Sequence, residues 1–231
     1  MFVTTTALGW LMIDPYGPQC ELRQIAAVAG VEVRFAPALA FAHGAGATVL
    51  WMDAPTHDVR LFGAKGDAKT NDTPAIQRAI DSACDPAMGK GGVVLFPPGV
   101  YRLGNPGLNV WDQVALLGVG WETPAGTAPI EGINGSWLYV DEPGTTAITI
   151  NGRGTTVRDI AFTHAQPAPT TDPAWAPADY PYAIRVEADD VRLENLFLRN
   201  PTQGILLFHS PEIPAGRVTM ERIWGQPLRE G

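Results

Sequence analysis

Residues 58–101 read DVRLFGAKGDAKTNDTPAIQRAIDSACDPAMGKGGVVLFPPGVY, and this stretch holds the clearest structural pattern in the chain. The pattern predicts a short strand at Val59–Gly63, a polar loop, a helix over residues 73–85 and, after a glycine-rich break, a second strand at Val93–Phe96. The helix is indicated by apolar residues at i, i+3, i+4 and i+7, which are Ile76, Ala79, Ile80 and Ala83. We therefore expect a strand–loop–helix–strand unit here.

The polar loop before the helix contains residues that also occur in ligand-binding loops. The segment GAKGDAKT, which starts at Gly63, lies between a strand and a helix, as a phosphate-binding loop does, but Ala68 replaces the glycine that such a loop needs before its lysine. A calcium loop is disfavoured because the glycine and the distal glutamate of an EF-hand are missing near Asp67, Asn71 and Asp72. We expect these side chains to form turns and to cap the helix, with Asp72 or Thr73 as the capping residue and Pro74 at the first helical position.

The same stretch resembles a known family. The segments that carry the resemblance are FGAKGDAKTNDTPAIQRAIDSA (62–83) and GGVVLFPPGVYRL (91–103). They look like the opening of the rhamnogalacturonase/epimerase-like pectate lyase superfamily. The resemblance implies an all-β fold, a right-handed parallel β-helix whose N-terminal end is plugged by this α-helix. Because the superfamily includes polysaccharide lyases, glycoside hydrolases, epimerases and phage tailspike proteins, the resemblance implies a fold and leaves the reaction open.

Composition limits the class of protein. Of the 231 residues, 45% are hydrophobic and 17% charged, as expected of a globular protein. The 25 glycines and 21 prolines require many turns, which favours an all-β or solenoid fold over a helical bundle. The net charge of −8, without a run of lysine or arginine, disfavours nucleic acid and anionic membranes as partners. An acidic polysaccharide would need a local basic patch or a metal ion to bind.

The compartment is not determined by the sequence. Cys20 and Cys84 lack the spacing of a disulfide framework, and we expect both to be free thiols. Residues 1–15 lack the positive start and the cleavage site of a signal peptide. Polar residues interrupt the apolar stretch 25–52, which is therefore not a transmembrane helix. The family resemblance favours an extracellular or virion-associated protein over a cytoplasmic one.

Residues 1–57 are predicted to form a small β-rich appendage, and residues 58–231 the parallel β-helix domain. Three strands are indicated in the appendage, at residues 10–13, 31–35 and 45–52. The second of them is predicted to be half-buried, because Val31, Val33 and Phe35 alternate with charged residues. His43 stands among small residues without a second metal-type ligand nearby, and we interpret it as a turn or surface histidine.

From residue 91 onward, short apolar strands follow one another between turns. They are indicated at residues 92–96, 114–120, 136–140, 146–150, 155–162, 182–186, 191–198, 204–208 and 217–224. Parallel strands normally need helical crossovers, and no amphipathic helix interrupts this series. The series therefore forms either a coil of strands or an antiparallel stack, and internal repetition decides between the two. Ile184 and Ile205 are 21 residues apart, and TVRDIAF, RLENLFL and TMERIW align in one register, which indicates the turns of a coil.

Equivalent positions of successive turns are predicted to stack into columns. Two inward columns are expected, Ile148 with Ile184 and Ile205, and Ile150 with Val186 and Leu207. A third set of equivalent residues is Val157, Leu193 and Met220. Asp159, Asn195 and Arg222 share the turn position that follows, and we interpret this position as structural because Asn and Asp satisfy turn backbone groups.

The outward face beside the two inward columns is the predicted place for chemistry. Alternation puts Arg185 and Glu187 there, with Thr149, Asn151, Leu206 and Phe208. Hydrolysis needs two carboxylates about 5–9.5 Å apart, and β-elimination needs a base with a metal ion or another cation. Arg185 and Glu187 are therefore the candidate catalytic residues, with a surface ion pair as the structural alternative. Calcium enters only if the protein is a lyase, and no other metal ion or cofactor is predicted.

Other polar residues receive weaker interpretations. Asp189 and Asp190 are assigned to a turn, and His164 and His209 follow strands without an assigned role. The catalytic motifs of polygalacturonase-type members are absent, since Arg222-Ile223, for example, is followed by tryptophan in place of lysine. We expect about five to seven turns of coil without a C-terminal cap, as in a fragment, a truncated gene or one part of an oligomer.

Two functions remain open at this point. The first is a carbohydrate-active or carbohydrate-binding protein for acidic polysaccharide, with lyase or hydrolase chemistry if it is an enzyme. The alternative is a phage or prophage tail protein, a homotrimeric shaft or receptor-binding spike without catalysis in this segment. A carboxylate pair on the outward face would favour the enzyme, and a bare face in a trimer would favour the spike.

Overall fold

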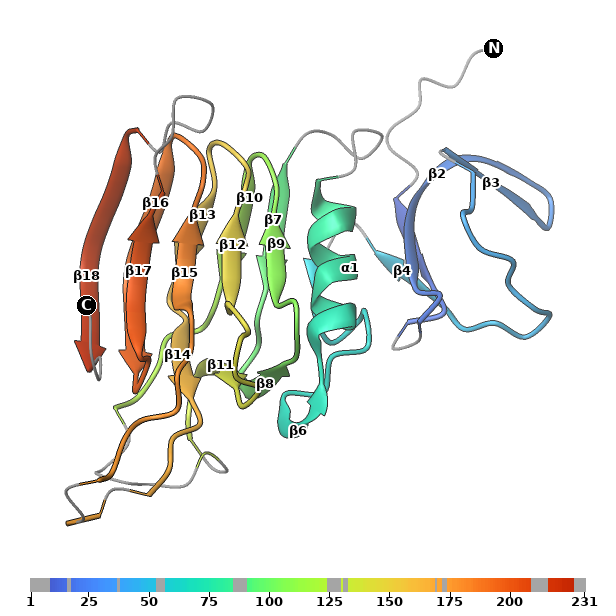
Figure 1. Cartoon of the computed structure of the whole chain (residues 1–231). Coiled ribbons are helices and arrows are strands. Elements are labelled where there is room, and N and C mark those ends of the chain that lie inside the picture. The colour runs from blue at the N-terminus through green and yellow to red at the C-terminus, as the bar shows by residue number, and fades with distance from the viewer. Residues whose placement is uncertain are drawn as a thin grey trace.

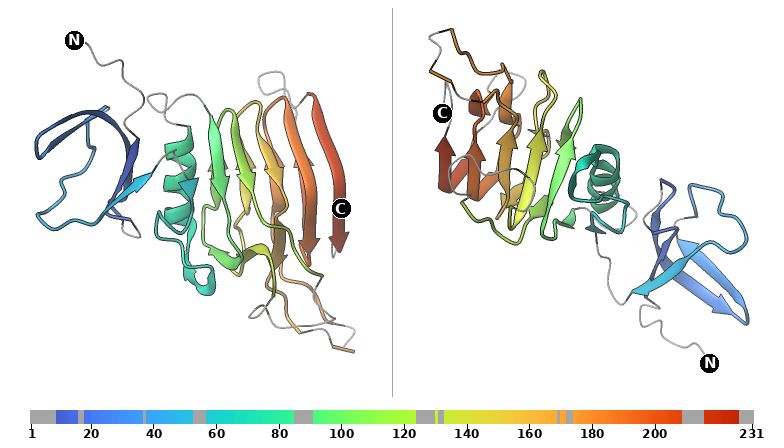
Figure 2. Two further views of the ribbon diagram at one scale, coloured as in Figure 1. Left: turned by 180° about the vertical axis from the view of Figure 1, so that it is seen from behind. Right: turned by 90° about the horizontal axis from the view of Figure 1, so that it is seen from below.

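The computed structural model describes residues 9–15, 18–36, 38–52, 57–84, 91–123, 130, 133–168, 170–171, 174–208 and 216–226. These residues form an N-terminal sheet, then helix α1 (Thr73–Ala83), then a coil of parallel strands, arranged in that order along one axis (Figure 1). The view from behind and the view from below show the same order (Figure 2). Across the described residues, α1 and any other helical segment are too short or too polar to cross a membrane.

The coil has three faces of parallel strands. The first contains β5 (His57–Asp58), β7 (Gly92–Leu95), β10 (Val114–Leu117), β13 (Thr156–Arg158) and the starts of β16 (Val191–Arg199) and β18 (Val218–Gln226). The second contains β6 (Asp67–Asn71), β8 (Gly99–Leu103), β11 (Ser136–Val140), β14 (Ala161–His164) and the ends of β16 and β18. The third contains β9 (Leu108–Val110), β12 (Ile148–Ile150), β15 (Tyr182–Val186) and β17 (Gln203–Leu207).

This arrangement is a parallel β-helix and confirms the predicted fold class. The chain visits the first, second and third face in turn and then stacks the next strand on the first face again. No helical crossover is needed, because each strand pairs with its equivalent one turn later. Strands that are far apart in the sequence therefore lie side by side, as β9, β12, β15 and β17 do in Figure 1.

The strand register confirms the alignment of the two predicted columns, but at the last turn Ile205 is half-buried and Leu207 is 41% exposed, so the inward position of Leu207 is not buried as predicted. Ile184 lies between Ile148 and Ile205, and Val186 lies between Ile150 and Leu207. The columns also extend one turn further, to Leu108 and Val110 of β9, a strand that the sequence did not predict. Their members in β9, β12 and β15 are fully or almost fully buried. Because apolar side chains stack every turn, each column is a continuous apolar ladder inside the coil.

Helix α1 closes one end of the coil, as predicted. Its buried face consists of Ile76, Ala79, Ile80 and Ala83 with Thr73 and Ala75, and these residues join the same apolar cluster as the inward columns. The helix ends at Ala83, and the predicted residue 85 lies outside the described residues. Pro74 is in the first turn as expected.

The loop before α1 differs from the prediction in its use of acidic side chains. Asp72 holds the N-cap position, but its carboxylate does not cap the helix. It accepts hydrogen bonds from the backbone N–H groups of Lys65 (2.7 Å) and Gly66 (2.9 Å). Asp67 likewise accepts the N–H groups of Lys69 (2.9 Å) and Thr70 (2.7 Å). The loop thus folds onto its own carboxylates, which occupy the N–H groups that a phosphate-binding loop would offer to its ligand.

The predicted strand at Val59–Gly63 is a turn. The pairing with β7 ends at Asp58 and the N–H of Val59, and the N–H groups of Leu61, Phe62 and Gly63 donate back to carbonyls three residues earlier. The apolar residues that suggested a strand, Val59 and Phe62, are buried against α1 instead. Burial of two apolar side chains does not require an extended backbone, so the pattern was ambiguous over so short a stretch.

The N-terminal sheet is antiparallel, with the order β3-β2-β1-β4. Its strands are β1 (Trp10–Ile13), β2 (Glu21–Ala29), β3 (Glu32–Ala36) and β4 (Val49–Met52). Met12, Cys20 and Leu22 of this sheet share the apolar cluster of α1, so the sheet packs onto the closed end of the coil. The division of the chain at residue 57 into appendage and domain stays a prediction.

Two features of this sheet depart from the sequence interpretation. The longest strand, β2, was not predicted, because ELRQIAAVA does not alternate regularly between apolar and polar residues. The predicted half-burial of β3 is wrong, since Val31 and Val33 are both exposed. β3 is an edge strand, and alternation alone does not reveal whether a layer covers its apolar side.

Candidate functional site

The outward face of the third sheet presents two rows of side chains. Register places Asn109, Thr149, Arg185 and Leu206 in the first row. The residues two positions further along each strand form the second row, which consists of Trp111, Asn151, Glu187 and Phe208. The face therefore combines amides, a hydroxyl, one cation, one carboxylate and two aromatic rings, as the predicted alternation required.

Arg185 and Glu187 are brought together on this face. The Nε of Arg185 forms an ion pair with Oε1 of Glu187, and the Cζ of Arg185 lies 4.6 Å from the ring centroid of Phe208. The guanidinium is thus held from one side by charge and supported from the other by an aromatic ring. Its terminal amino groups make no ion pair or hydrogen bond with the described residues. The side chain of Arg185 is 39% exposed, so these groups can reach a ligand.

Glu187 is the one carboxylate among the residues of the two rows. Its side chain is 18% exposed and paired with Arg185. A second carboxylate at the separation that glycoside hydrolysis requires is not supplied by these two rows. The described residues also contain no group of three or more His, Cys, Asp or Glu side chains arranged to hold a metal ion. The ion pair predicted as the structural alternative is present. The carboxylate of Glu187 is engaged by Arg185, and this contact does not assign Glu187 the role of a catalytic base.

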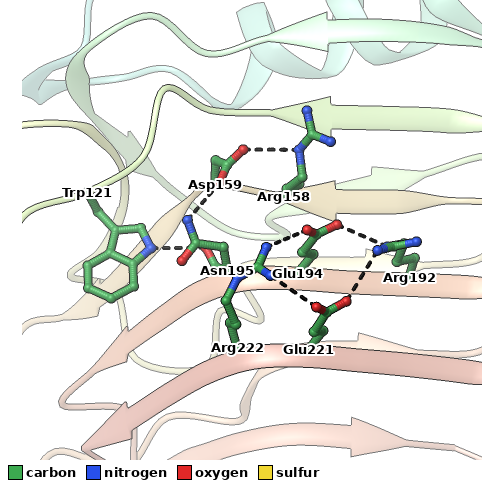
Figure 3. Close-up of polar contacts among 8 residues, drawn as sticks. All are labelled: Trp121, Arg158, Asp159, Arg192, Glu194, Asn195, Glu221 and Arg222. Carbon is green, nitrogen blue, oxygen red and sulfur yellow. Dashed lines mark hydrogen bonds and ion pairs between the residues drawn. The ribbon is translucent and has the colours of Figure 1, made fainter.

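The turn position shared by Asp159, Asn195 and Arg222 is structural, as expected. All three residues have positive φ, at 60°, 49° and 51°. The amide of Asn195 donates to the carboxylate of Asp159 at 2.6 Å, which ties two turns of the coil together (Figure 3). The indole Nε1 of Trp121 donates to the carbonyl of Asn195 at 2.9 Å. A left-handed residue at each of these corners turns the chain from the first face onto the second.

Beside this corner, the first face carries a ladder of ion pairs. Arg192 pairs with Glu194 (3.0 Å) and with Glu221 (3.3 Å), and Arg222 pairs with both glutamates in turn (Figure 3). Two arginines and two glutamates from adjacent strands neutralise one another. We call these four residues the ionic ladder. Because its charges are mutually satisfied, the ionic ladder holds strands in register and offers little attraction to a charged ligand.

The remaining acidic candidates are also paired. Asp190 accepts two hydrogen bonds from Arg217, at 2.5 and 2.7 Å, and its own φ of 58° places it in a turn. The bonds from Arg217 outweigh the opposing effect of desolvation and hold the pKa of Asp190 below its usual value. Asp189 accepts the N–H of Gly216 at 2.6 Å and pairs with Arg153 at 3.1 Å. Both residues therefore lie where the predicted turn role puts them.

The histidines have unlike surroundings. His164 lies in β14 inside the coil, in edge-to-face contact with Tyr180, and burial lowers its pKa to about 4. His43, interpreted as a turn or surface histidine, lies in the segment between β3 and β4, but its side chain is only 7% exposed. Its Nδ1 pairs with Asp14 and its Nε2 with Glu21 (2.8 Å), which raises its pKa. His209 lies outside the described residues.

A cavity of about 660 Å³ lies inside the last described turns of the coil. Its lining is Leu198, Pro201, Gly204, Ile205, Met220, Ile223 and Gly225. None of these side chains is titratable or able to recognise a polar ligand. The cavity continues the apolar interior of the coil and is separate from the Arg185 face.

Comparison with known proteins places this fold in a family. Residues 57–205 match the sequence profile described as Rhamnogalacturonase A/epimerase, pectate lyase-like. Alginate lyase 7 of Azotobacter vinelandii is 53% identical over 47 residues, which are 20% of this chain and 5% of that protein. Mannuronan C5-epimerase AlgE3 of the same organism is 45% identical over 74 residues, which are 29% of this chain and 4% of that protein.

Two solved structures match the chain at lower identity. The A-module of mannuronan C-5 epimerase AlgE4 from Azotobacter vinelandii has 21% identity, a TM-score of 0.35 and coverage of 64% of this chain and 41% of that module. The ORF18 protein of Geobacillus virus E2 has 19% identity, a TM-score of 0.39 and coverage of 63% of this chain and 25% of its own. The chain spans only 4–5% of the length of the two curated relatives named above. The profile match covers more than half of the sequence, and the chain belongs to the rhamnogalacturonase A/epimerase, pectate lyase-like family.

Proposed function

We propose that this chain binds an acidic polysaccharide on the outward face of β9, β12, β15 and β17, as part of a polysaccharide-active protein. The proposal is supported by relatives whose names assign them alginate lyase and mannuronan epimerase activities. Alginate and mannuronan are polyuronates, so each sugar carries a carboxylate. A protein with a net charge of −8 needs a local cation to attract such a chain.

The observation that carries the proposal is the setting of Arg185. Glu187 holds its Nε and Phe208 supports its plane, while the two terminal amino groups have no partner among the described residues. A guanidinium in this state offers parallel N–H groups to a carboxylate, and its position is fixed before the ligand arrives. Arg185 therefore acts as the receptor for one uronate carboxylate.

If the protein is an enzyme, the same contact favours chemistry beside the carboxylate. A cation on a uronate carboxylate acidifies the neighbouring C–H, which is the proton removed in β-elimination and in C5-epimerisation. Hydrolysis is less favoured, because Glu187 has no carboxylate partner in the two rows.

Binding is tested by titrating alginate, polygalacturonate and a neutral mannan into the protein and into Arg185→Ala. We expect binding of the two acidic polymers and a loss of about tenfold to a hundredfold in affinity for the variant, because a charge-assisted contact is removed. Arg185→Lys should recover only part of the affinity, since lysine lacks the planar pair of N–H groups. Arg158→Ala, which removes an exposed arginine from the first face, is the matched control.

Three product assays then separate the reactions. Ultraviolet absorbance of an unsaturated sugar reports β-elimination, reducing ends without absorbance report hydrolysis, and a changed uronate ratio in NMR spectra reports epimerisation. Equal affinity of Arg185→Ala and the parent protein for alginate would refute the proposal. Absence of binding to every polymer by folded protein would leave a structural shaft as the better interpretation.

A further inference from the structure

Trp111, directly after β9, lies in the same row of outward side chains as Glu187. Register pairs Val110 with Ile150, and Ile150 with Val186, so the next residues along these strands follow the same order. Trp111 is 37% exposed, although large aromatic side chains in the coil interior are fully buried. The indole therefore adds an accessible aromatic surface to the face that carries Arg185.

The capping helix holds this indole in place. Nε1 of Trp111 donates to Oδ1 of Asp81 at 2.8 Å, and the same oxygen accepts Nε2 of Gln77 at 2.9 Å. Gln77 also exchanges two hydrogen bonds with the backbone of Asn109, at 2.9 and 3.0 Å. α1 is thereby fastened to β9, which lies beside it in Figure 1. The ring is oriented before any ligand binds, so binding loses little side-chain entropy.

We infer that Trp111 is a stacking platform for a second sugar ring of the same polysaccharide, so that the binding face extends from Arg185 to the capping helix. The inference rests on the function proposed above. Between the two residues, Asn151 donates from Nδ2 to Oδ1 of Asn109 at 3.0 Å. An amide side chain has further donor and acceptor positions, which a linear saccharide that crosses the strands would meet.

Charge decides which part of the sugar meets Trp111. Asp81 lies beside the indole, and the nearest members of the two rows are the amides of Asn109 and Asn151, without a cation. A uronate carboxylate is therefore disfavoured next to Trp111, whereas the apolar C–H face of a sugar ring suits the indole surface. Arg185 thus recognises the carboxylate of one uronate, and Trp111 recognises the apolar face of another sugar ring by its shape.

The distance between the two contacts makes saccharide length the test. Two strand spacings separate β9 from β15, which is about 10 Å, so the shortest oligosaccharides reach Arg185 without reaching Trp111. We expect Trp111→Leu to weaken binding of long alginate oligosaccharides by about tenfold and to leave that of the shortest ones unchanged. Trp111→Phe keeps an aromatic face and should retain most of the affinity. Trp224→Ala removes a tryptophan that is 62% exposed on the second face and is the matched control.

Each outcome of the titration has one meaning. A loss confined to long oligosaccharides and rescued by phenylalanine supports the platform. An equal loss at every length overturns it, because Trp111 would then act by supporting the fold of the face. Unchanged binding in Trp111→Leu, with binding that still depends on Arg185, overturns the platform and leaves the proposed function intact. If the parent protein binds no oligosaccharide, the proposed function fails and the platform with it.

Discussion

The N-terminal sheet and the coil place their charged groups in opposite ways. In the sheet, Glu21 is buried and accepts hydrogen bonds from the backbone of Ala40 and Phe41, from Arg23 and from His43. In the coil, the interior is built from apolar columns, and the ionic ladder lies outside on the first face. The sheet is thus held to its long connecting segment by charge, and the coil is held together by stacked apolar side chains.

The difference shows how repetition affects the interior of a β protein. Each turn of the coil adds equivalent apolar residues to the same columns, so the interior grows by apolar stacking. Buried ionisable side chains such as His164 and Arg199 lie outside these columns. The N-terminal sheet has four strands and no repeat, and the segment after β3 offers few buried apolar residues. Burial raises the pKa of Glu21, but its hydrogen bonds outweigh burial and keep that pKa below its usual value. In the N-terminal sheet, hydrogen bonds to the charged Glu21 hold the connecting segment in place, whereas in the coil the packing of apolar side chains holds the strands together.

The largest expected effect comes from an inward column. Ile184→Ala should lower the free energy of unfolding by about 3 kcal/mol, because it opens a cavity between Ile148 and Ile205. Arg185→Ala, at the outward neighbour, should change it by less than about 1 kcal/mol. Urea-induced unfolding measures both. A cost for Ile184→Ala no greater than that for Arg185→Ala would mean that the columns do not carry the stability of the coil.

The next effect is a loss of coil stability in acid. Burial lowers the pKa of His164 to about 4, whereas an unfolded histidine titrates near about 6.5. Between these values the unfolded chain binds more protons, so stability is full above about pH 6.5 and falls as the pH drops to about 4, by up to about 3 kcal/mol. His164→Phe should remove most of this slope in unfolding experiments at several pH values. An unchanged slope would assign the acid sensitivity to other groups.

The N-terminal sheet should respond to pH with the opposite sign. Both ring nitrogens of His43 face carboxylates, Asp14 and Glu21, with Arg23 on the far side of Glu21. A neutral imidazole donates only one hydrogen bond, so the stabilisation is present below the unfolded pKa and lost as the pH rises through the raised folded pKa of His43. His43→Gln should cost about 1–2 kcal/mol. Hydrogen exchange at the Ala40 and Phe41 amides, corrected for intrinsic rates, should quicken at high pH in the parent and be pH-independent in His43→Gln.

The smallest effect is expected in the ionic ladder. Glu194→Gln removes the carboxylate shared by Arg192 and Arg222. Because these pairs lie at the surface, the loss of thermal stability should be slight and should vanish at about 0.5 M salt, where surface charges are screened. Thermal unfolding at low and high salt provides the measurement. A large loss of thermal stability that persists in salt would mean that the ionic ladder stabilises the coil as much as the apolar columns do.

Much of the coil was predictable because it repeats. The register of Val157, Leu193 and Met220 and the corner residues Asp159 and Asn195 were read from aligned motifs, and the structure confirms them. The N-terminal sheet was less predictable because its pairings are not repeated. A single strand such as β2 has no second copy in the chain to confirm it.

The candidate site was predictable only in part. Period-2 alternation placed Arg185 and Glu187 on one face, and they do form an ion pair. The support of Arg185 by Phe208, and of Trp111 by Asp81, was missed, since these contacts join different turns of the coil through side-chain directions. Phe208 lay in the predicted outward rows and would have pointed to the first contact, whereas Trp111 follows β9, a strand that was not predicted.

The sequence by itself determined that this chain coils, which residues face inward, and where the corners fall, because a repeated apolar pattern has one way to bury itself. Only the tertiary structure decided which arginines pair with two glutamates, as Arg192 and Arg222 do, and which pairs with one, as Arg185 does. Arg192 of the ionic ladder and Arg185 have similar local sequences, with a glutamate two residues after each of them. The strand that stacks next to each decides the outcome: β18 brings Glu221 and Arg222 to Arg192, whereas β17 brings no carboxylate to Arg185. Charge pairing between turns depends on which strand stacks next to each arginine, and the sequence around the arginine does not encode that strand.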